Sequence, residues 1–231
     1  MTARPEAAML FAAGFGTRMG DLTRDRPKPL VEVAGRPLID HALDLIRPLG
    51  LPRVVANLHY KPEMLRAHLE PMGIALSQET PNILDTGGGL RAARSLLGPG
   101  PVFTLNTDAI WAGPNPLDLL RAGWDTARMD ALLICVPPGR ARGRSGAGDF
   151  AMEADGRIAR GPGLIYGGAQ IIRTDLLDEI EEEVFSLNRV WDRMLARGRL
   201  FALEYPGHWC DVGHPGGIAL AETLLAEAGN V

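Results

Sequence analysis

Short apolar runs alternate with segments of helical periodicity along the first part of the chain. Residues 7–13 form an apolar run that ends at a glycine-rich stretch, which is typical of a buried parallel strand. Further strands are predicted at residues 53–57, 74–77, 102–106 and 131–136. Helices are predicted between them, at residues 37–46, from residue 62, and at residues 87–97. This order predicts the α/β class, in which crossover helices join parallel strands.

The pattern changes after Pro137, where arginines and glycines are interleaved. Short strand-like pieces follow, near residues 150, 157 and 165–172. They indicate antiparallel hairpins beside a loop. A helix and two closing strands are predicted further on, at residues 187–196, 200–205 and 208–212. Ser186 is suited to cap that helix, and a last helix is expected from Pro215. No linker is visible, so we expect one domain over residues 1–231.

Composition excludes several classes of protein. The 231 residues carry a formal net charge of −4, so the chain lacks the basic surface of a general nucleic-acid binder. Two cysteines are too few for a disulfide scaffold or a four-cysteine zinc site, and they favour the reducing cytoplasm. No run approaches the ~18 apolar residues of a membrane span. We therefore expect a cytoplasmic protein with no nucleic-acid or membrane partner. The oligomeric state is left open, a monomer included.

The strongest chemical signal is the loop that follows the first predicted strand. Glycines directly after a strand allow several backbone N–H groups to converge on an anion, and Gly14 and Gly16 hold that position. Arg18 and Lys28 add two cations that can reach phosphate oxygens. A dinucleotide-binding turn would need a third glycine, and a P-loop would need Gly-Lys-Ser or Gly-Lys-Thr. Neither pattern is present, so the loop predicts a phosphate site of another kind.

Three further segments have both a structural and a chemical interpretation. Asp108 closely follows the strand at residues 102–106, at the end where open α/β sheets place ligands, although an aspartate there can also cap a helix. Gly87 to Gly89 suit either a helix start or a close backbone approach to a ligand. Asp211 on its own is an ordinary turn residue. A zinc site near His208 and Cys210 is disfavoured because the usual ligand spacing is missing.

Taken together, these segments resemble the sugar-1-phosphate nucleotidyltransferase family. Residues 10–19 read Leu-Phe-Ala-Ala-Gly-Phe-Gly-Thr-Arg-Met and are followed by Pro-Lys-Pro-Leu at residues 27–30, which is close to that family's signature. Residues 84–89, 103–108 and 209–213 resemble three later motifs of the same family. The resemblance covers nearly the whole chain. It implies a Rossmann-like, mostly parallel sheet flanked by helices, with a small antiparallel subdomain on the substrate side.

The resemblance also implies roles for individual residues. Arg18, Lys28, Asp108 and Asp211 would be catalytic, and the two aspartates would hold Mg²⁺ on the nucleotide phosphates. Nucleotide binding would fall to residues of the two glycine-containing loops: Ala12, Ala13, Gly14, Gly16, Thr17, Arg18, Lys28, Thr86, Gly87 and Gly88. The sugar phosphate would contact Asn106, Asp149 and Gly168. Residues 137–212 would then be the half that completes the substrate and metal sites.

Within this family, the sequence is most similar to the N-acetylmuramate-1-phosphate uridylyltransferases of peptidoglycan recycling. Residues 148–150 and 185–192 carry that similarity. It implies that UTP and a sugar 1-phosphate react to give a UDP-sugar and pyrophosphate. Two alternatives stay open. One is the same chemistry on glucose-1-phosphate, mannose-1-phosphate or phosphocholine with another nucleoside triphosphate, and the other is a regulatory subunit that binds the nucleotide without turning it over.

Overall fold

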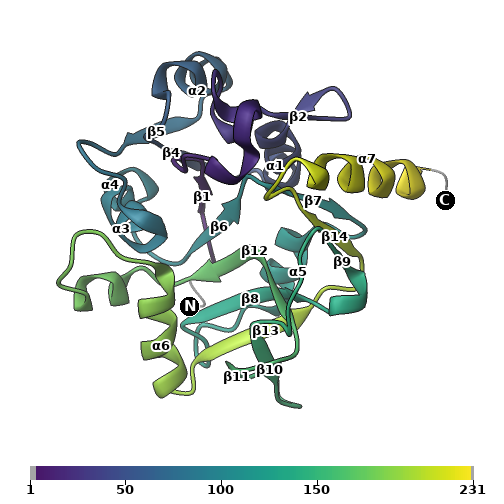
Figure 1. The fold of residues 1–231 in the computed structure, drawn as a ribbon. Coiled ribbons are helices and arrows are strands. Elements are labelled where there is room, and N and C mark those ends of the chain that lie inside the picture. The colour runs from purple at the N-terminus through teal and green to yellow at the C-terminus, as the bar shows by residue number, and fades with distance from the viewer. Residues whose placement is uncertain (1–3, 230–231) are drawn as a thin grey trace.

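The centre of the protein is a seven-stranded sheet with the strand order β13-β8-β12-β6-β1-β4-β5 (Figure 1). The computed structural model describes residues 4–229. The sheet strands are β1 (Ala7–Phe11), β4 (Arg53–Leu58), β5 (Ala75–Gln78), β6 (Val102–Asn106), β8 (Ala131–Val136), β12 (Ile165–Ile172) and β13 (Leu200–Glu204). Every neighbouring pair is parallel except the two that β12 forms with β6 and β8. The predicted mostly parallel sheet is confirmed.

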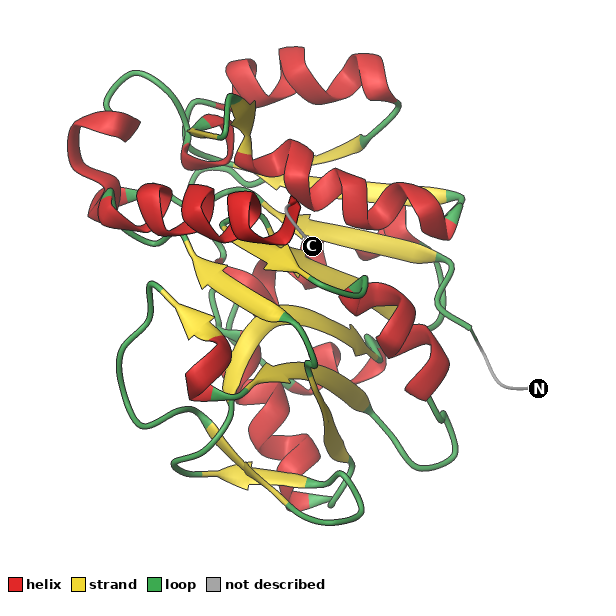
Figure 2. Ribbon diagram, turned by 90° about the vertical axis from the view of Figure 1, so that its right-hand side faces the viewer, coloured by secondary structure: helices red, strands yellow, loops and turns green. Residues whose placement is uncertain are grey.

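Helices cover both faces of this sheet, as Figure 2 shows from the side. One face packs against α1 (Leu38–Ile46), α2 (Pro62–Leu69) and α5 (Pro116–Gly123). The other face packs against α3 (Asp85–Ala92), α4 (Arg94–Leu97) and α6 (Leu187–Ala196). Side chains alternate along β1, so Ala8 and Leu10 enter the first core cluster while Ala7 and Met9 enter the second. A strand buried on both faces explains the unbroken apolar run in the sequence.

Three small sheets lie beside the central one. Their strands are β2 (Glu32–Val33) with β3 (Arg36–Pro37), β10 (Phe150–Met152) with β11 (Ile158–Arg160), and β7 (Ala109–Ala112) and β9 (Ala141–Arg142) on either side of β14 (His208–Asp211). The last helix, α7 (Gly216–Gly229), packs on this three-stranded sheet. Short 3-10 helices complete the chain: η1 (Thr17–Thr23), η2 (Lys28–Leu30), η3 (Arg47–Leu49), η4 (Glu70–Met72), η5 (Pro138–Arg140) and η6 (Asp175–Glu179).

Several element predictions need correction. The stretch at residues 165–172 is a central strand of the main sheet rather than a hairpin piece, because its apolar side chains fill the space between β6 and β8. The two predicted closing strands separate, since β13 joins the main sheet and β14 joins a small one. The predicted helix at residues 87–97 is two helices that meet at Ala93. Strand β7 and helix α5 were not predicted. The division of the chain at residue 137 stays a prediction.

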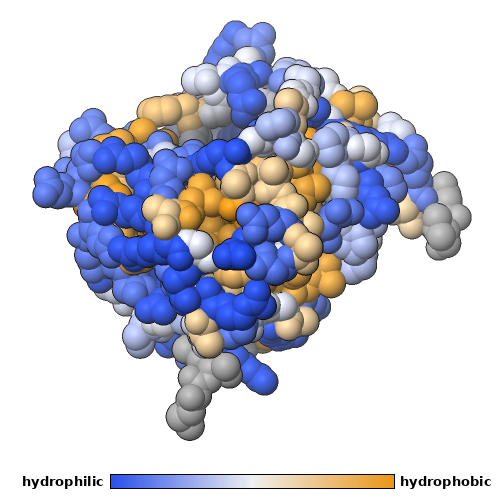
Figure 3. Space-filling model, turned by 90° about the horizontal axis from the view of Figure 1, so that it is seen from below, coloured by the Kyte–Doolittle hydropathy of each residue, from blue (hydrophilic) through white to orange (hydrophobic). Residues whose placement is uncertain are grey.

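No helix within residues 4–229 is both long enough and apolar enough to cross a bilayer. Figure 3 views the molecule from below and shows mostly hydrophilic residues, with apolar ones gathered near the centre of that face. The two cysteines, Cys135 and Cys210, are both buried free thiols.

Candidate active site

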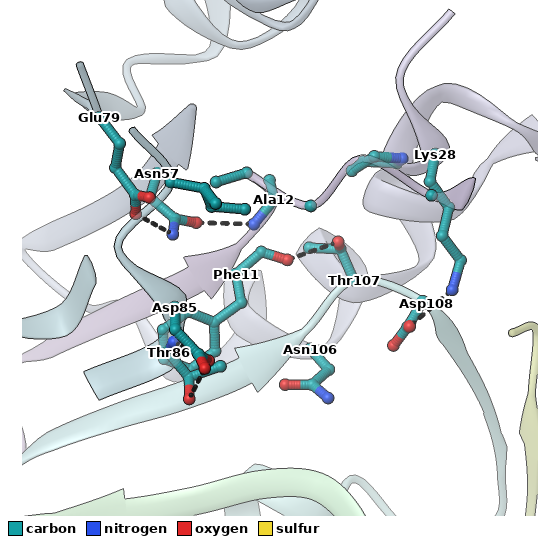
Figure 4. Close-up of a pocket in the computed structure, with 15 residues that line it drawn as sticks. Phe11, Ala12, Lys28, Asn57, Glu79, Asp85, Thr86, Asn106, Thr107 and Asp108 are labelled. Carbon is teal, nitrogen blue, oxygen red and sulfur yellow. Dashed lines mark hydrogen bonds and ion pairs between the residues drawn. The ribbon is translucent and has the colours of Figure 1, made fainter. Parts of the chain in front are cut away.

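A cavity of about 240 Å³ lies at the carboxyl ends of β1, β4, β5 and β6. Its position follows from the strand order. The chain leaves β1 towards β4 and β5 on one side and then returns to place β6 on the other side. Crossovers that diverge in this way leave a crevice between the strands, which is where open α/β sheets bind ligands. Figure 4 shows the lining, which includes Phe11, Ala12, Ala13, Gly14, Gly16, Lys28, Asn57, Glu79, Asp85, Thr86, Asn106, Thr107 and Asp108.

The glycine loop folds back onto Lys28. Gly16 has a φ of 65°, and a Cβ there would lie 2.8 Å from the Cβ of Lys28, so the loop needs glycine at this point. The Thr23 hydroxyl donates to the carbonyl of Gly16 at 3.0 Å and holds the turn. Gly14 differs, because nothing lies within 4 Å of the position its Cβ would occupy. Its exposed backbone therefore faces open space, as a surface that accepts a ligand would.

The structure brings the four predicted catalytic residues together. The Lys28 ammonium donates to Asp108 Oδ2 at 2.6 Å. Asp211 is placed beside this pair because β14 pairs with β7, and Val212 N donates to the carbonyl of Asp108 at 2.9 Å. A Cβ on Gly213 would lie 2.9 Å from Asp211 Oδ2 and 3.0 Å from Arg18 Nη1, so this guanidinium adjoins that carboxylate. Two carboxylates and two cationic side chains thus lie together beside the glycine loop.

The electrostatics confirm that the two carboxylates are close. The pKa of Asp211 is raised, first by burial and then by the negative charge of Asp108. The positive charges of Lys28, Arg18 and Arg144 act in the opposite direction but do not cancel the rise in pKa. Ionisation of Asp211 is therefore less favourable here than in water, and a bound cation would favour it.

A buried polar network that the sequence did not reveal fixes the other side of the cavity. Asn57 Oδ1 accepts from the N–H of Ala12 at 2.7 Å, and Asn57 Nδ2 donates to Glu79 Oε1 at 2.7 Å (Figure 4). The N–H of Leu84 donates to Glu79 Oε2 at 2.7 Å. Glu79 is only 2% exposed. The network ties the ends of β4 and β5 to the start of the glycine loop. The signal available in the sequence was a polar residue directly at the end of each of these strands.

A second cavity, of about 270 Å³, opens from the first. The two share the lining residues Phe11, Asp85, Thr86 and Asn106. The second is completed by residues from the later part of the chain: Arg144, Asp149, Phe150, Arg160, Tyr166, Ser186, Leu187, Asn188 and Trp191. Together the cavities fall in the size range of ligand pockets, ~300–1,000 Å³. Of the charged centre, Lys28 and Asp108 line the first cavity, whereas Arg18 and Asp211 lie beside them and line neither cavity. The arrangement therefore offers two adjoining binding spaces, with the charged centre at the edge of the first.

The match to known proteins agrees with this geometry. Residues 8–226 match the family described as the MobA-like NTP transferase domain. The chain belongs to this family. The transferase is 40% identical to the N-acetylmuramate alpha-1-phosphate uridylyltransferase of Caulobacter vibrioides, over 99% of its own length and 100% of that relative. It is 32% identical to the protein of the same name from Neisseria meningitidis, over 89% of its own length and 92% of that relative.

Solved structures extend the likeness of fold beyond these relatives. The inositol-1-phosphate CTP transferase of T. maritima matches with a TM-score of 0.76 at 14% identity, over 99% of this transferase and 98% of that chain. An identity this low shows a shared fold and nothing about substrate.

The residues predicted to contact sugar phosphate lie in different places. Asn106 lines both cavities, and its side-chain amide forms no hydrogen bond with another residue in the described part of the chain. Asp149 lines the second cavity, where Oδ1 accepts from Arg144 at 2.6 Å and Oδ2 accepts from the N–H of Tyr166 at 2.9 Å. Gly168 is buried and lines neither cavity. It has a φ of 89°, and a Cβ there would lie 2.9 Å from Asn106 Cβ. Gly168 thus makes room for Asn106.

The second glycine-containing loop has a packing role that was not predicted. The N–H groups of Gly87 and Gly88 donate to the carbonyl of Phe185 at 2.9 and 3.0 Å. A Cβ on Gly87 would overlap the Phe185 ring, and one on Gly88 would overlap the carbonyl of Glu183. Neither glycine lines a cavity, whereas Thr86 lines both. The glycines therefore allow α3 to approach the segment before α6, and their binding of a nucleotide base stays a prediction.

The arginines after Pro137 are held by specific partners. Arg140 donates to the carbonyl of Pro206 at 2.8 Å, and Arg142 pairs with Glu227 at 2.6 Å. Of these arginines, Arg144 lines the second cavity. The segment is therefore held against the β13–β14 turn and α7.

A larger cavity, of about 940 Å³, lies at the opposite, amino end of β6. Its arginines are paired with neighbouring acids, Arg94 with Asp178 at 2.6 Å and Arg173 with Asp175 at 2.7 Å. Parallel strands direct catalytic loops to their carboxyl ends, so this cavity lies away from the chemistry despite its size.

Proposed function

We propose that the transferase joins UTP and N-acetylmuramate 1-phosphate to give UDP-N-acetylmuramate and pyrophosphate. The observation that carries the proposal is the meeting of Lys28, Arg18, Asp108 and Asp211 beside the glycine loop, at the edge of a cavity that adjoins a second one. One cavity suits a nucleoside triphosphate and the other a sugar phosphate. The names of the two uridylyltransferase relatives support the choice of substrates.

The residues would act mainly by positioning and by neutralising charge. The backbone N–H groups of residues 13–17, with Arg18 and Lys28, would bind the triphosphate and withdraw charge from the departing pyrophosphate, since the N–H of Ala12 is already bonded to Asn57. The acceptor is a phosphate oxygen that is already anionic at neutral pH, so its in-line attack on the α-phosphorus needs no general base. Asn106 would orient the acceptor, because its unpaired amide reaches both cavities.

The acidic pair fits a Mg²⁺ ion. Within residues 4–229, no three His, Cys, Asp or Glu side chains are grouped closely enough to hold a metal by themselves. Asp108 and Asp211 are close enough to raise the pKa of Asp211, and they supply only oxygen ligands. Mg²⁺ is commonly bound by one or two carboxylates together with substrate phosphates and water. Bound there, Mg²⁺ would neutralise charge on the phosphate oxygens.

The cytoplasm is the expected location of the reaction. UTP is a cytoplasmic metabolite, and two buried, unpaired cysteines suit a reducing compartment. No nucleic acid or membrane is needed as a partner.

A substrate panel tests the proposal. The purified protein would be given UTP, dTTP, GTP or CTP with each of several 1-phosphates, and pyrophosphate release would be measured with and without Mg²⁺. We expect the highest kcat/KM with UTP and N-acetylmuramate 1-phosphate, and loss of activity when Mg²⁺ is chelated. A clear preference for mannose-1-phosphate, glucose-1-phosphate or phosphocholine would overturn the assignment of N-acetylmuramate 1-phosphate as the acceptor. UTP binding without pyrophosphate release on any acceptor would indicate a regulatory subunit instead.

A further inference from the structure

The second cavity contains a cation that the reaction itself does not use. N-acetylmuramate differs from N-acetylglucosamine by a lactyl ether on O3, which carries a carboxylate. A transferase that selects this sugar therefore needs a donor for a second negative group, separate from the phosphate site. Two guanidinium groups line the second cavity, those of Arg144 and Arg160.

Arg144 belongs to the phosphate end of the cavity. It donates to Asp149 Oδ1 at 2.6 Å, and its charge acts on the reaction-centre carboxylate of Asp211. Arg160 is not among the charges that act on Asp211. It ends strand β11 and lies beside Asn188 and Trp191 of α6. The phosphate on C1 and the ether on C3 leave a pyranose ring from different positions, so an acceptor with two anionic groups needs a second cation besides the one near the reaction centre.

The Arg160 guanidinium is oriented by its neighbours without a ligand. Its Nε and Nη2 both donate to Asp192 Oδ1, at 3.1 and 2.8 Å. Its Cζ lies 5.0 Å from the centre of the Phe150 ring and 5.8 Å from that of Trp191, within the range of cation–π attraction. Trp191 is fixed in turn, because its Nε1 donates to Gln170 Oε1 at 3.0 Å. A group held in this way loses little freedom when it binds.

The same guanidinium keeps donors for a ligand. Within the described residues, its Nη1 takes part in no hydrogen bond. Its partner Asp192 is 59% exposed, so water screens that pair and leaves the cation available. The positive end of the ten-residue helix α6 faces the same cavity through Ser186 and Leu187.

We propose that Arg160 binds the lactyl carboxylate and sets the preference for N-acetylmuramate 1-phosphate over N-acetylhexosamine 1-phosphates that lack this group. The inference rests on the proposed function and adds a specificity-determining residue to it. It predicts that the contribution of Arg160 depends on the acceptor, whereas that of the reaction centre does not.

The test compares two acceptors that differ only in the lactyl group. Pyrophosphate release with saturating UTP and Mg²⁺ would be measured for N-acetylmuramate 1-phosphate and N-acetylglucosamine 1-phosphate, using the wild type, Arg160→Met, Arg160→Lys, Arg144→Met and Arg157→Met. Arg157 is an exposed arginine of the same β10–β11 unit, is paired with Asp155 at 2.9 Å, and lines neither of these two cavities, so its variant is a matched control.

We expect Arg160→Met to lower kcat/KM for the muramate substrate about 10- to 100-fold, mainly through KM, as loss of a charge-assisted contact does. Activity on N-acetylglucosamine 1-phosphate should stay within about twofold, which also shows that the variant is folded. Arg160→Lys should restore part of the muramate activity, and Arg157→Met should match the wild type. The muramate KM of the wild type should rise with salt more than that of Arg160→Met.

The outcomes separate this inference from the proposed function. A wild type with no preference for the muramate substrate would overturn the proposed function and the inference with it. A wild type that prefers it, with equal losses on both acceptors or none in Arg160→Met, would overturn only the inference. A selective loss in Arg144→Met and not in Arg160→Met would place the carboxylate at Arg144 and would also reject it.

Discussion

The two connected cavities are built in different ways. The first is lined by residues at the ends of β1, β4, β5 and β6, and its polar groups are locked by buried hydrogen bonds such as those of Asn57 and Glu79. The second is lined by a loop, a two-stranded hairpin and the start of α6, and its charges form partly exposed ion pairs. Chemistry that needs fixed geometry thus lies on the sheet. In the proposed function, the acceptor would be selected by side chains of the second cavity, which can change without disturbing the sheet.

The largest expected effect comes from the charged centre at the edge of the first cavity. Asp108→Asn and Lys28→Ala each remove a group aimed at charge that develops in the reaction, so kcat should fall about 10²- to 10³-fold with any acceptor. Pyrophosphate release under saturating substrates measures this. Asp118→Asn, which removes an exposed carboxylate on α5, is the matched control and should keep wild-type turnover. Near-normal turnover in either active-site variant would contradict the assigned roles.

A smaller effect is expected from the network that belongs to the first cavity alone. Asn57→Ala would leave the N–H of Ala12 and one oxygen of Glu79 buried without their partner, which lowers the free energy of unfolding by about 1–3 kcal/mol. The loosened glycine loop should raise KM for UTP about tenfold, the kinetic equivalent of ~1.4 kcal/mol. Urea unfolding and steady-state kinetics would measure the two quantities.

The contrast with Asn188→Ala makes that prediction specific. Asn188 lines only the second cavity, so its variant should change KM for the sugar phosphate and leave KM for UTP as it was. An Asn57→Ala protein whose KM for UTP is unaltered would show that the network stabilises the fold without shaping the nucleotide site.

A substitution at Gly168 can displace Asn106, because the two residues are in close contact. Gly168→Ala would combine strain at a φ of 89° with a Cβ 2.9 Å from Asn106, so the amide between the cavities must shift. We expect kcat/KM for the sugar phosphate to fall several-fold to about tenfold, as the displacement of a positioning group does. Gly139→Ala is the control, because nothing lies within 4 Å of its Cβ position. Equal kinetics for the two alanine variants would remove Gly168 from any role in positioning.

The sequence allowed most of the first cavity to be predicted and little of the second. Its glycine loop and Asp108 are continuous with buried strands, so local pattern identified them. Asn57 and Glu79 were missed because their contact depends on which strands become neighbours. Gly87 and Gly88 were assigned to a nucleotide base, yet the contacts that require glycine come from Phe185 and Glu183, about a hundred residues away. The helix α5 had a signal that was overlooked, since Asn115 caps it and Pro116 opens it.

The second cavity was harder to predict because its arrangement depends on an irregularity in strand β12. Gly167 and Gly168 interrupt the apolar run of β12, which was predicted as one strand-like piece among antiparallel hairpins. In the sheet they form an irregularity between Tyr166 and Gln170 where the pairing with β8 shifts register. Glycines inside a strand commonly mark such a bulge or a close approach. Only the neighbouring Asn106 shows which of these the position requires.

The smallest expected effect concerns Asp211, where a substitution should change stability and activity in opposite directions. The folded-state pKa of Asp211 is raised, mainly by burial, so the folded protein binds this proton more tightly than the unfolded chain does. Its ionisation therefore destabilises the fold increasingly as the pH rises above the ordinary aspartate pKa of ~3.9. Asp211→Asn removes that penalty. Without divalent cations, the variant should be slightly more stable than the wild type at pH 7, and the difference should vanish towards pH 4.

Urea unfolding between pH 4 and pH 8 would measure this difference, and a variant less stable than the wild type at pH 7 would contradict it. The same substitution should abolish the stabilisation that UTP and Mg²⁺ together give the wild type, since only the ionised carboxylate binds the cation. The ionised Asp211 carboxylate thus lowers the free energy of unfolding of the protein without ligand and raises it when UTP and Mg²⁺ are bound. Its contribution to stability therefore depends on the ligand. The Asn57–Glu79 network differs, because its hydrogen bonds stabilise the protein without any ligand.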